Sequence, residues 1–302
     1  MNSEKITNII HQYSKKHNII GLAVLIIKDD KSHTFFTGEM KKGTNNTVNK
    51  NSLFEIGSIT KLFTNLLFKK ISETGKISLD NKVSDFLPDM KSVGSITIRQ
   101  LITHTSGLPR LPKNLKPKNI SNPYREYTEQ DLENFLKLYK NEKTPGEIFE
   151  YSNVGYALLS YILIKIENTS YENILKINIL QPLGMEHTYI HIPKKEYGFL
   201  AQGYNSDGNK ISLWNQEIFV GAGGIVSNIS DMEKFLKWNM AQSEPLLAFV
   251  KQKNIFWHNG MTGGYASFLA FNIENKTGLV ILANTAKSVD NLAKEIFGNL
   301  KL

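Results

Sequence analysis

Apolar residues recur at helical spacing near the start of the chain and again over residues 60–73. Between these two predicted helices lie the apolar run IIGLAVLII (19–27) and the β-prone stretch HTFFTG (33–38), separated by a charged turn. This order predicts a helix over 3–17 followed by a β-hairpin. The second helix is expected to end at Gly75, because glycine readily adopts the backbone conformation that terminates a helix.

The middle of the chain is mostly helical with many turn signals. Short helices and loops are expected over 76–143, including a proline-punctuated surface loop at 109–123. A second long helix is predicted at 153–167. A further helix is predicted around 230–241, with Ser230-Asp231 as its N-terminal cap.

The last fifty residues return to β-structure. We predict three strands, at 254–258, 265–272 and 277–284. A closing helix is predicted at 286–300. Strands at both ends of a helical middle predict an α+β fold, in which one antiparallel sheet from the N- and C-terminal segments is flanked by helices. We expect a single catalytic unit spanning 1–302, with an α/β region at about 1–75 and 215–302 and an all-helical region at about 76–214.

Composition narrows the classes of function. The 302 residues carry 36 lysines and arginines against 28 acidic residues, a formal charge of +8, but the lysines are scattered singly or in pairs. A nucleic-acid partner is therefore not expected, because phosphate binding needs a contiguous basic surface. The absence of cysteine excludes disulfides, thiol nucleophiles and cysteine-based zinc sites.

Cofactors and membrane segments are not predicted either. The sequence has no Gly-x-Ser-x-Gly elbow, phosphate loop or dinucleotide fingerprint, so no organic cofactor is expected. His187 and His191 lie four residues apart but are not part of an HExxH motif, so no metal site is expected. The longest apolar run is far too short for a transmembrane helix, and the first twenty residues lack a signal-peptide core. As written, the chain is expected to be cytoplasmic. A trimmed N-terminus would allow an extracellular or cell-surface location, and the oligomeric state is left open.

One candidate for chemistry lies at the start of the 60–73 helix. Ser58 and Lys61 are three residues apart, so on a helix their side chains project from the same face and can touch. A lysine amine can accept the serine proton only where burial or neighbouring cations favour its neutral form. Alone, the S-x-x-K pattern is common and more often marks a solvated helix start.

Two further motifs change that interpretation. Tyr151 and Asn153 lie two apart on a turn that leads into the 153–167 helix, where a phenol can relay a proton and the Asn153 amide can hold a substrate amide oxygen. His258, Asn259 and Gly260 lie at the edge of a predicted strand, before a glycine turn. An edge strand of this kind can bind a peptide-like substrate and offer an N–H group to a developing oxyanion.

In order and relative spacing, the three motifs resemble those of the serine β-lactamase and penicillin-binding protein family: class C β-lactamases, DD-peptidases and their esterase relatives. They correspond to S-x-x-K (Ser58, Lys61), Y-x-N (Tyr151, Asn153) and [KH]-x-G (His258, Gly260). Flanking stretches also look like family signatures: LITHTSGLP (101–109), PGEIFEYSNVGY (145–156), QPLGMEHT (181–188) and GAGGIVSNISDMEKF (221–235).

The resemblance implies a role for each residue. Ser58 would be the acylated nucleophile, and Lys61 and Tyr151 its proton-transfer partners, with the choice of acylation base open. The backbone N–H groups of Ser58 and Met261 would form the oxyanion hole. Four residues would bind substrate: Asn153, His258, Asn259 and Gly260.

The third motif departs from class C β-lactamases, which usually carry Lys-Thr-Gly. A histidine is mostly neutral near pH 7, so we expect carboxylate recognition at His258 to weaken or to depend on pH. The chain is therefore expected to be a serine hydrolase acting on peptide, amide, ester or β-lactam bonds, in the manner of a DD-peptidase or esterase. Its substrate would be a small molecule or peptide, including D-amino-acid compounds. The alternatives are a β-lactamase and a penicillin-binding sensor or ligand-binding module with little turnover.

Overall fold

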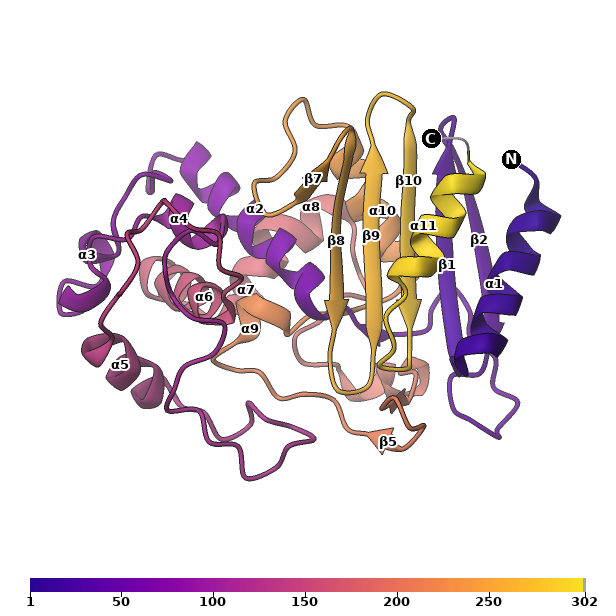
Figure 1. Cartoon of the computed structure of the whole chain (residues 1–302), viewed down its shortest axis with the longest axis horizontal. Coiled ribbons are helices and arrows are strands. Elements are labelled where there is room, and N and C mark those ends of the chain that lie inside the picture. Colours follow the sequence, from indigo (N-terminus) through magenta and orange to yellow (C-terminus); the bar gives the residue numbers. More distant parts are fainter. Residues whose placement is uncertain (301–302) are drawn as a thin grey trace.

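A computed structural model describes residues 1–300. Its central feature is a six-stranded antiparallel sheet in which strands from the two ends of the chain lie side by side (Figure 1). The strand order is β2 (Lys31–Gly38), β1 (Gly21–Lys28), β10 (Thr277–Ala283), β9 (Ala266–Asn272), β8 (Ile255–Met261) and β7 (Val250–Gln252). The predicted α+β fold, with one antiparallel sheet built from both ends, is confirmed.

The centre of the sheet explains the long apolar run of the sequence. β1 pairs with β10 so that Val24 lies opposite Ile281, and both strands are buried along nearly their whole length. A strand covered on both faces has no polar side to show, so it is uniformly apolar rather than alternating.

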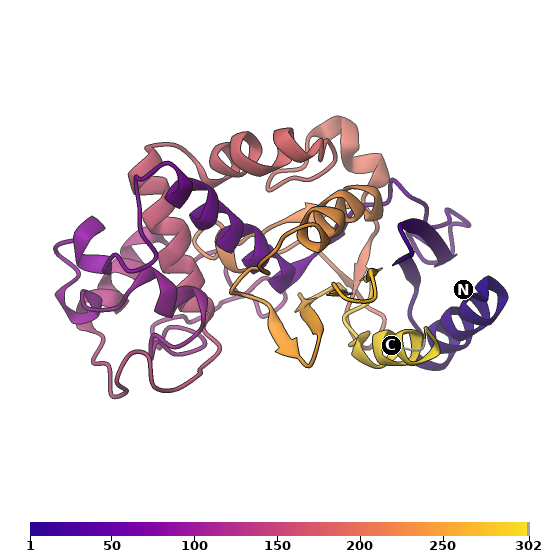
Figure 2. The ribbon, with the colours of Figure 1, turned by 90° about the horizontal axis from the view of Figure 1, so that it is seen from above.

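The terminal helices cover one face of the sheet. α1 (Ser3–His17) and α11 (Asp290–Asn299) lie side by side against this face, as the view from above shows (Figure 2). Their apolar sides bury Ile6, Ile10, Leu292 and Ile296 in one hydrophobic cluster with β1, β9 and β10. The Asn2 side chain accepts a hydrogen bond from Lys5 N, which caps α1.

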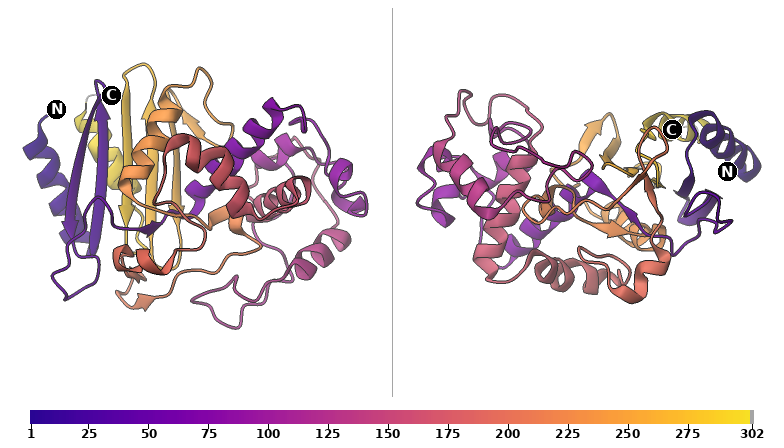
Figure 3. Two further views of the ribbon diagram at one scale, coloured as in Figure 1. Left: turned by 180° about the vertical axis from the view of Figure 1, so that it is seen from behind. Right: turned by 90° about the horizontal axis from the view of Figure 1, so that it is seen from below.

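The opposite face carries α2 (Thr60–Glu73) and α10 (Ile229–Met240), and beyond them the helical region (Figure 3). Phe63 of α2 stacks on Phe235 of α10 with ring centroids 3.9 Å apart. The same hydrophobic cluster continues into the helical region. The remaining α-helices are α3 (Val83–Phe86), α4 (Ile98–Ile102), α5 (Glu129–Leu138), α6 (Asn153–Glu167), α7 (Tyr171–Leu175), α8 (Gln181–Leu183) and α9 (Val220–Gly223).

Short elements connect the two parts. The short strands form two small ladders, β3 (Phe54–Glu55) with β6 (Val226–Ser227) and β4 (Gly203–Tyr204) with β5 (Lys210–Ile211). Single turns of 3₁₀ or π type are η1 (Gly57–Ile59), η2 (Lys91–Val93), η3 (Lys176–Leu180) and η4 (Lys194–Phe199).

Two predicted boundaries differ from the structure. The last helix begins at Asp290 rather than at residue 286, because the preceding segment stays extended: Asn284 N bonds to Gly21 O, and Ala286 N bonds to Tyr204 O. The cap of α10 is the side chain of Asn228, which accepts from Asp231 N at 2.8 Å, and not Ser230-Asp231.

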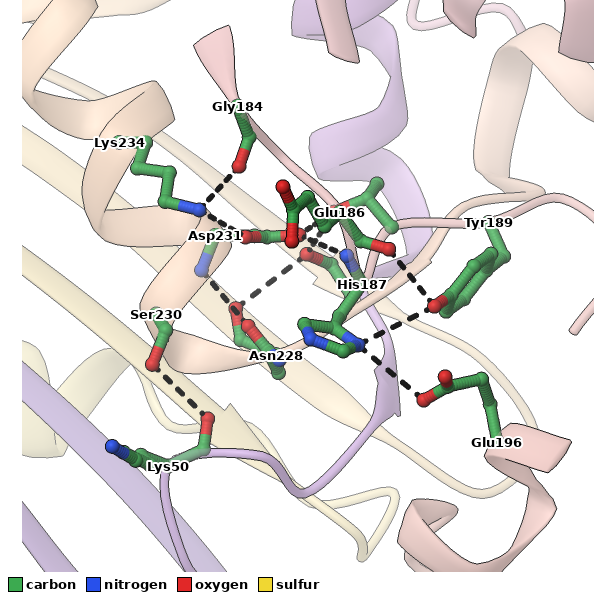
Figure 4. A network of polar contacts seen from close by, with 12 residues as sticks. Lys50, Gly184, Glu186, His187, Tyr189, Glu196, Asn228, Ser230, Asp231 and Lys234 are labelled. Atoms are coloured by element: carbon green, nitrogen blue, oxygen red, sulfur yellow. Dashed lines mark hydrogen bonds and ion pairs between the residues drawn. The ribbon is translucent and has the colours of Figure 1, made fainter. Parts of the chain in front are cut away.

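Asp231 instead joins α10 to the segment after α8 (Figure 4). Its carboxylate is buried and accepts hydrogen bonds from His187 N at 2.7 Å and the Thr188 hydroxyl at 3.0 Å. Lys234, one turn along α10, pairs with it at 2.9 Å. The QPLGMEHT stretch is thus attached to α10 through one buried carboxylate.

Replacing this carboxylate tests its contribution to stability. Asp231→Ala removes the acceptor of His187 N and of the Thr188 hydroxyl and the partner of Lys234, so we expect the free energy of unfolding to fall by about 2–4 kcal/mol in urea denaturation followed by circular dichroism. Lys237→Ala removes an exposed ion pair with Glu233 on the same helix and is expected to cost less than about 1 kcal/mol. Equal losses in the two variants would contradict the role given to Asp231.

Candidate active site

Ser58 lies in the η1 turn, directly before α2. The turn follows β3 and begins at Gly57, which has φ +49°, a left-handed conformation that glycine adopts without strain. Lys61 lies in the first turn of α2, and its Nζ is 3.2 Å from Ser58 Oγ. The predicted contact between serine and lysine is present.

Lys61 is completely buried, which is rare for a lysine. Its Nζ donates to the carbonyl of Ala222 at 2.6 Å and lies 5.0 Å from the ring centroid of Tyr151 and 5.3 Å from that of Tyr156. Among the residues described, no carboxylate pairs with it. Burial lowers the pKa of Lys61 well below its usual value, and the positive charge of Arg110 lowers it further.

Tyr151 approaches Ser58 from the helical region. Its hydroxyl donates to Ser58 Oγ at 2.7 Å. Burial raises the pKa of Tyr151, while the hydrogen bond with Ser58 and the charge of Arg110 act in the opposite direction. The next residue, Ser152, caps α6 by accepting from Gly155 N at 2.9 Å, so the start of this helix fixes where the phenol points.

A histidine behind Tyr151 holds the same turn. Nδ1 of His104 accepts from Ser152 N at 3.0 Å, and its ring packs on that of Tyr151 with centroids 4.5 Å apart. Burial, assisted by the charge of Lys61, lowers the pKa of His104 to about 3. His104 is therefore neutral at physiological pH and acts here as a hydrogen-bond acceptor that shapes the turn.

Strand β8 completes the surroundings of Ser58. A Cβ atom on Gly260 would overlap the carbonyl oxygen of Ile56 and lie 2.9 Å from Ser58 N. Likewise, a Cβ atom on Gly57 would lie 2.7 Å from Met261 N. Glycine at these two positions lets the backbone of β8 lie directly against the nucleophile turn, with Ser58 N and Met261 N in that contact.

The two side chains before Gly260 point to opposite faces of the sheet. His258 is buried on the Ser58 side; its Nδ1 bonds to Asn259 O at 2.7 Å, and burial and the charge of Lys61 lower its pKa to about 4. The Asn259 side chain lies on the other face and donates to Asp290 of α11 at 3.0 Å. The Asn259 side chain therefore faces away from Ser58, because successive residues of a strand alternate between faces, and the predicted substrate contact of Asn259 is left to its backbone.

A small cavity of about 80 Å³ opens beside Ser58. Asn153 and Met261, both predicted site residues, line it, and the amide oxygen of Asn153 is buried without a hydrogen-bond partner among the described residues. Sequence reasoning missed several other lining residues: Arg110, Tyr124, Trp214, Gln216, Phe219 and Thr262. Only Arg110 had an available signal, since it directly follows the LITHTSGLP stretch.

Comparison with known proteins identifies the family. The family model "Beta-lactamase" matches residues 6–253. The chain belongs to the Beta-lactamase family. A β-lactamase of Providencia stuartii is 30% identical over 243 residues, covering 80% of this chain and 60% of that protein. Protein flp of Staphylococcus aureus is 25% identical over 325 residues, covering 93% of this chain and 63% of its own length.

Solved structures agree with this family. A class C β-lactamase has a TM-score of 0.85 at 26% identity, covering 95% of this chain and 94% of its own. Another, in complex with cefoxitin, has a TM-score of 0.85 at 25% identity and covers 95% of both chains. A D-alanine carboxypeptidase from Burkholderia cenocepacia, at 24% identity and TM-score 0.83 over 97% of this chain and 96% of its own, shares the fold.

The resemblance drawn from the motifs is thus confirmed at the level of the family. The chain spans about 60% of the length of the curated β-lactamases that it matches. Within residues 1–300, no helix has the length and apolar character needed to span a membrane.

Glu55 is a buried carboxyl group that joins two sides of this Beta-lactamase-family site. It accepts from Trp214 N at 2.6 Å and from the Thr262 hydroxyl at 2.6 Å, and both of these residues line the cavity. Burial raises the pKa of Glu55 to about 7, although both hydrogen bonds favour the ionised form. Glu55 therefore holds the end of β8 and the Trp214 segment together.

The raised pKa predicts a specific pH dependence of stability. Because folded Glu55 binds its proton more tightly than unfolded Glu55, its contribution to the free energy of unfolding falls as pH rises from about 4.5 to about 7. Urea denaturation of wild type and Glu55→Gln at several pH values is expected to show the difference between them changing by on the order of 2–3 kcal/mol across this window. A constant difference would refute the raised pKa.

Proposed function

We propose that this chain is a serine hydrolase that forms an acyl-enzyme at Ser58. The observation that carries the proposal is that Ser58 Oγ lies within hydrogen-bond reach of two proton-transfer groups: the buried Lys61 amine at 3.2 Å and the Tyr151 phenol at 2.7 Å. A serine hydroxyl becomes a useful nucleophile when a group beside it can take its proton.

The two shifted pKa values favour Lys61 as the acylation base. Burial favours the uncharged form of both groups, and an uncharged amine is a base whereas an uncharged phenol is an acid. Neutral Lys61 can donate to Ala222 O and accept the Ser58 proton with its lone pair, while Tyr151 donates to Ser58 Oγ. Ser58 Oγ would then attack the substrate carbonyl as its proton passes to Lys61.

Breakdown of the tetrahedral intermediate needs a proton on the leaving group. Tyr151 would deliver its phenolic proton to the leaving nitrogen or oxygen and recover a proton from Lys61, which leaves Ser58 acylated and the site neutral. The oxyanion would be held by the N–H groups of Ser58 and Met261, which the close contact of Gly57 with β8 brings into one region. Water would then hydrolyse the acyl-enzyme.

The substrate is proposed to be an amide, peptide or ester, in the manner of a DD-peptidase or esterase. The buried, unpartnered amide oxygen of Asn153 can accept an N–H group from the acyl side of a peptide-like substrate, and His258 provides no permanent cation. β-Lactam hydrolysis is the second candidate, supported by the names of the relatives and by the cefoxitin complex of one structural neighbour. The speed of deacylation separates these two activities and a penicillin-binding sensor.

The first test is the intact mass of the protein over time after addition of a penicillin. We expect a covalent adduct on wild type and none on Ser58→Ala, because the variant lacks the hydroxyl that the penicillin would acylate. Lys61→Arg replaces the neutral amine with a permanent cation and so removes the base, and its acylation is expected to slow by about 10²–10⁴-fold. Drug consumption is followed in the same tube.

Each outcome has a distinct meaning. A persistent wild-type adduct indicates a peptidase-like enzyme or a sensor, whereas drug hydrolysis without an accumulating adduct indicates a β-lactamase. If the drug survives without an adduct, esters and D-amino-acid amides are tested next. Turnover by Ser58→Ala would reject the proposal.

His258 gives a second prediction, on carboxylate recognition. With a pKa of about 4, His258 stays neutral from pH 5.5 to 8, so its titration should not change the preference for substrates with a leaving-group carboxylate in this range. His258→Lys adds a cation and is expected to raise kcat/KM for a D-alanyl-D-alanine peptide relative to its C-terminal amide by about tenfold. His258→Gln is the neutral control. An unchanged ratio in the lysine variant would contradict this role of the third motif.

A further inference from the structure

Arg110 is attached to the Tyr151–Asn153 turn by its backbone. Asn153 N donates to Arg110 O at 3.0 Å, and the Ser152 hydroxyl donates to Pro109 O at 2.7 Å. Two hydrogen bonds from one motif therefore fix the loop that carries Arg110.

The Arg110 side chain lies over the ring of Tyr151, at the cavity beside Ser58. Its guanidinium carbon lies 5.1 Å from the centroid of the Tyr151 ring, and Arg110 lines the small cavity together with Ser58. Within residues 1–300 it forms no ion pair, whereas Arg99, in the same region, is paired with Asp80 at 2.9 Å. A guanidinium has five N–H donors, and stacking on a ring leaves its edge free for an anion.

Among the described residues that line this cavity, Arg110 alone has a charged side chain. His258, the position where relatives with Lys-Thr-Gly carry a cation, is buried and does not line it. A permanent positive charge is therefore present at the site, but it comes from the loop beside Asn153 and not from β8.

We propose that Arg110 binds an anionic group, such as a carboxylate, in the acyl part of the substrate. The proposal rests on the acyl-enzyme function proposed above. The acyl part is assigned because Asn153 N donates to Arg110 O and both residues line the cavity beside Ser58. The amide oxygen of Asn153 is the group proposed above to accept an N–H group from the acyl side of the substrate. The guanidinium would form paired N–H···O bonds with the carboxylate, which select for planar anions.

Two activated esters with the same leaving group test this directly. Mono-p-nitrophenyl glutarate carries a free carboxylate in its acyl part, and methyl p-nitrophenyl glutarate is its neutral counterpart. The measured quantity is the ratio of kcat/KM for the anionic ester to that for the neutral ester, after subtraction of the rate with Ser58→Ala. Both esters release p-nitrophenol, so the ratio isolates recognition of the acyl part.

We expect wild type to favour the anionic ester and Arg110→Gln to lower the ratio by about 10–100-fold. Arg110→Lys should keep part of the preference, because it retains the charge but loses the paired geometry. Arg99→Gln, which removes a surface arginine, should leave the ratio unchanged. Raising the salt concentration should reduce the wild-type ratio, since screening weakens exposed ion pairs.

The outcomes separate this proposal from the one that it rests on. If wild type hydrolyses neither ester and forms no Ser58 adduct, the proposed function fails. If the neutral ester is hydrolysed through Ser58 but the ratio does not change in Arg110→Gln, the role of Arg110 is overturned. Equal slowing of both esters would also overturn it, because the charge would then act only on Lys61 and Tyr151.

Discussion

The site depends on a lysine amine that is buried beside a serine hydroxyl without a carboxylate to neutralise it. Keeping an isolated ammonium out of water is so unfavourable that Lys61 shifts towards its neutral form. The carbonyl of Ala222 accepts one of its hydrogens, while the rings of Tyr151 and Tyr156 exclude water. An acidic partner at this position would restore the charge and remove the basicity.

This environment is assembled from segments far apart in the sequence. The η1 turn supplies Ser58, α2 supplies Lys61, and the turn before α6 supplies Tyr151. The α9 turn supplies the Ala222 carbonyl, and β8 lies against the nucleophile turn. Residues such as Gly260 and His104 make no direct contribution to the chemistry. They allow close approach of backbones and fix turns, which sets the distances on which proton transfer depends.

The sequence predicted the parts of the site that follow from local periodicity. The helical spacing of Ser58 and Lys61, the turn before α6 and the three C-terminal strands are all local patterns, and each is present. The Asn259 side chain faces α11 because the residues of β8 alternate between the two faces of the sheet. The burial of His258 and the partners of Glu55 arise only when separate segments pack together, so no local pattern indicates them. Arg110 directly follows the LITHTSGLP stretch, but its position over Tyr151 also depends on this packing.

The position of β10 between β1 and β9 also governs the order in which the sheet can form. On a growing chain, the β1–β2 hairpin is complete after about 40 residues, yet the other edge of β1 has no partner until residues 277–283 have been made. This edge is apolar and rich in β-branched residues, the kind of surface that pairs with other chains. All the residues between β2 and β10 must therefore be synthesised while β1 is paired along one edge only, so its other edge is open to pairing with other chains during translation.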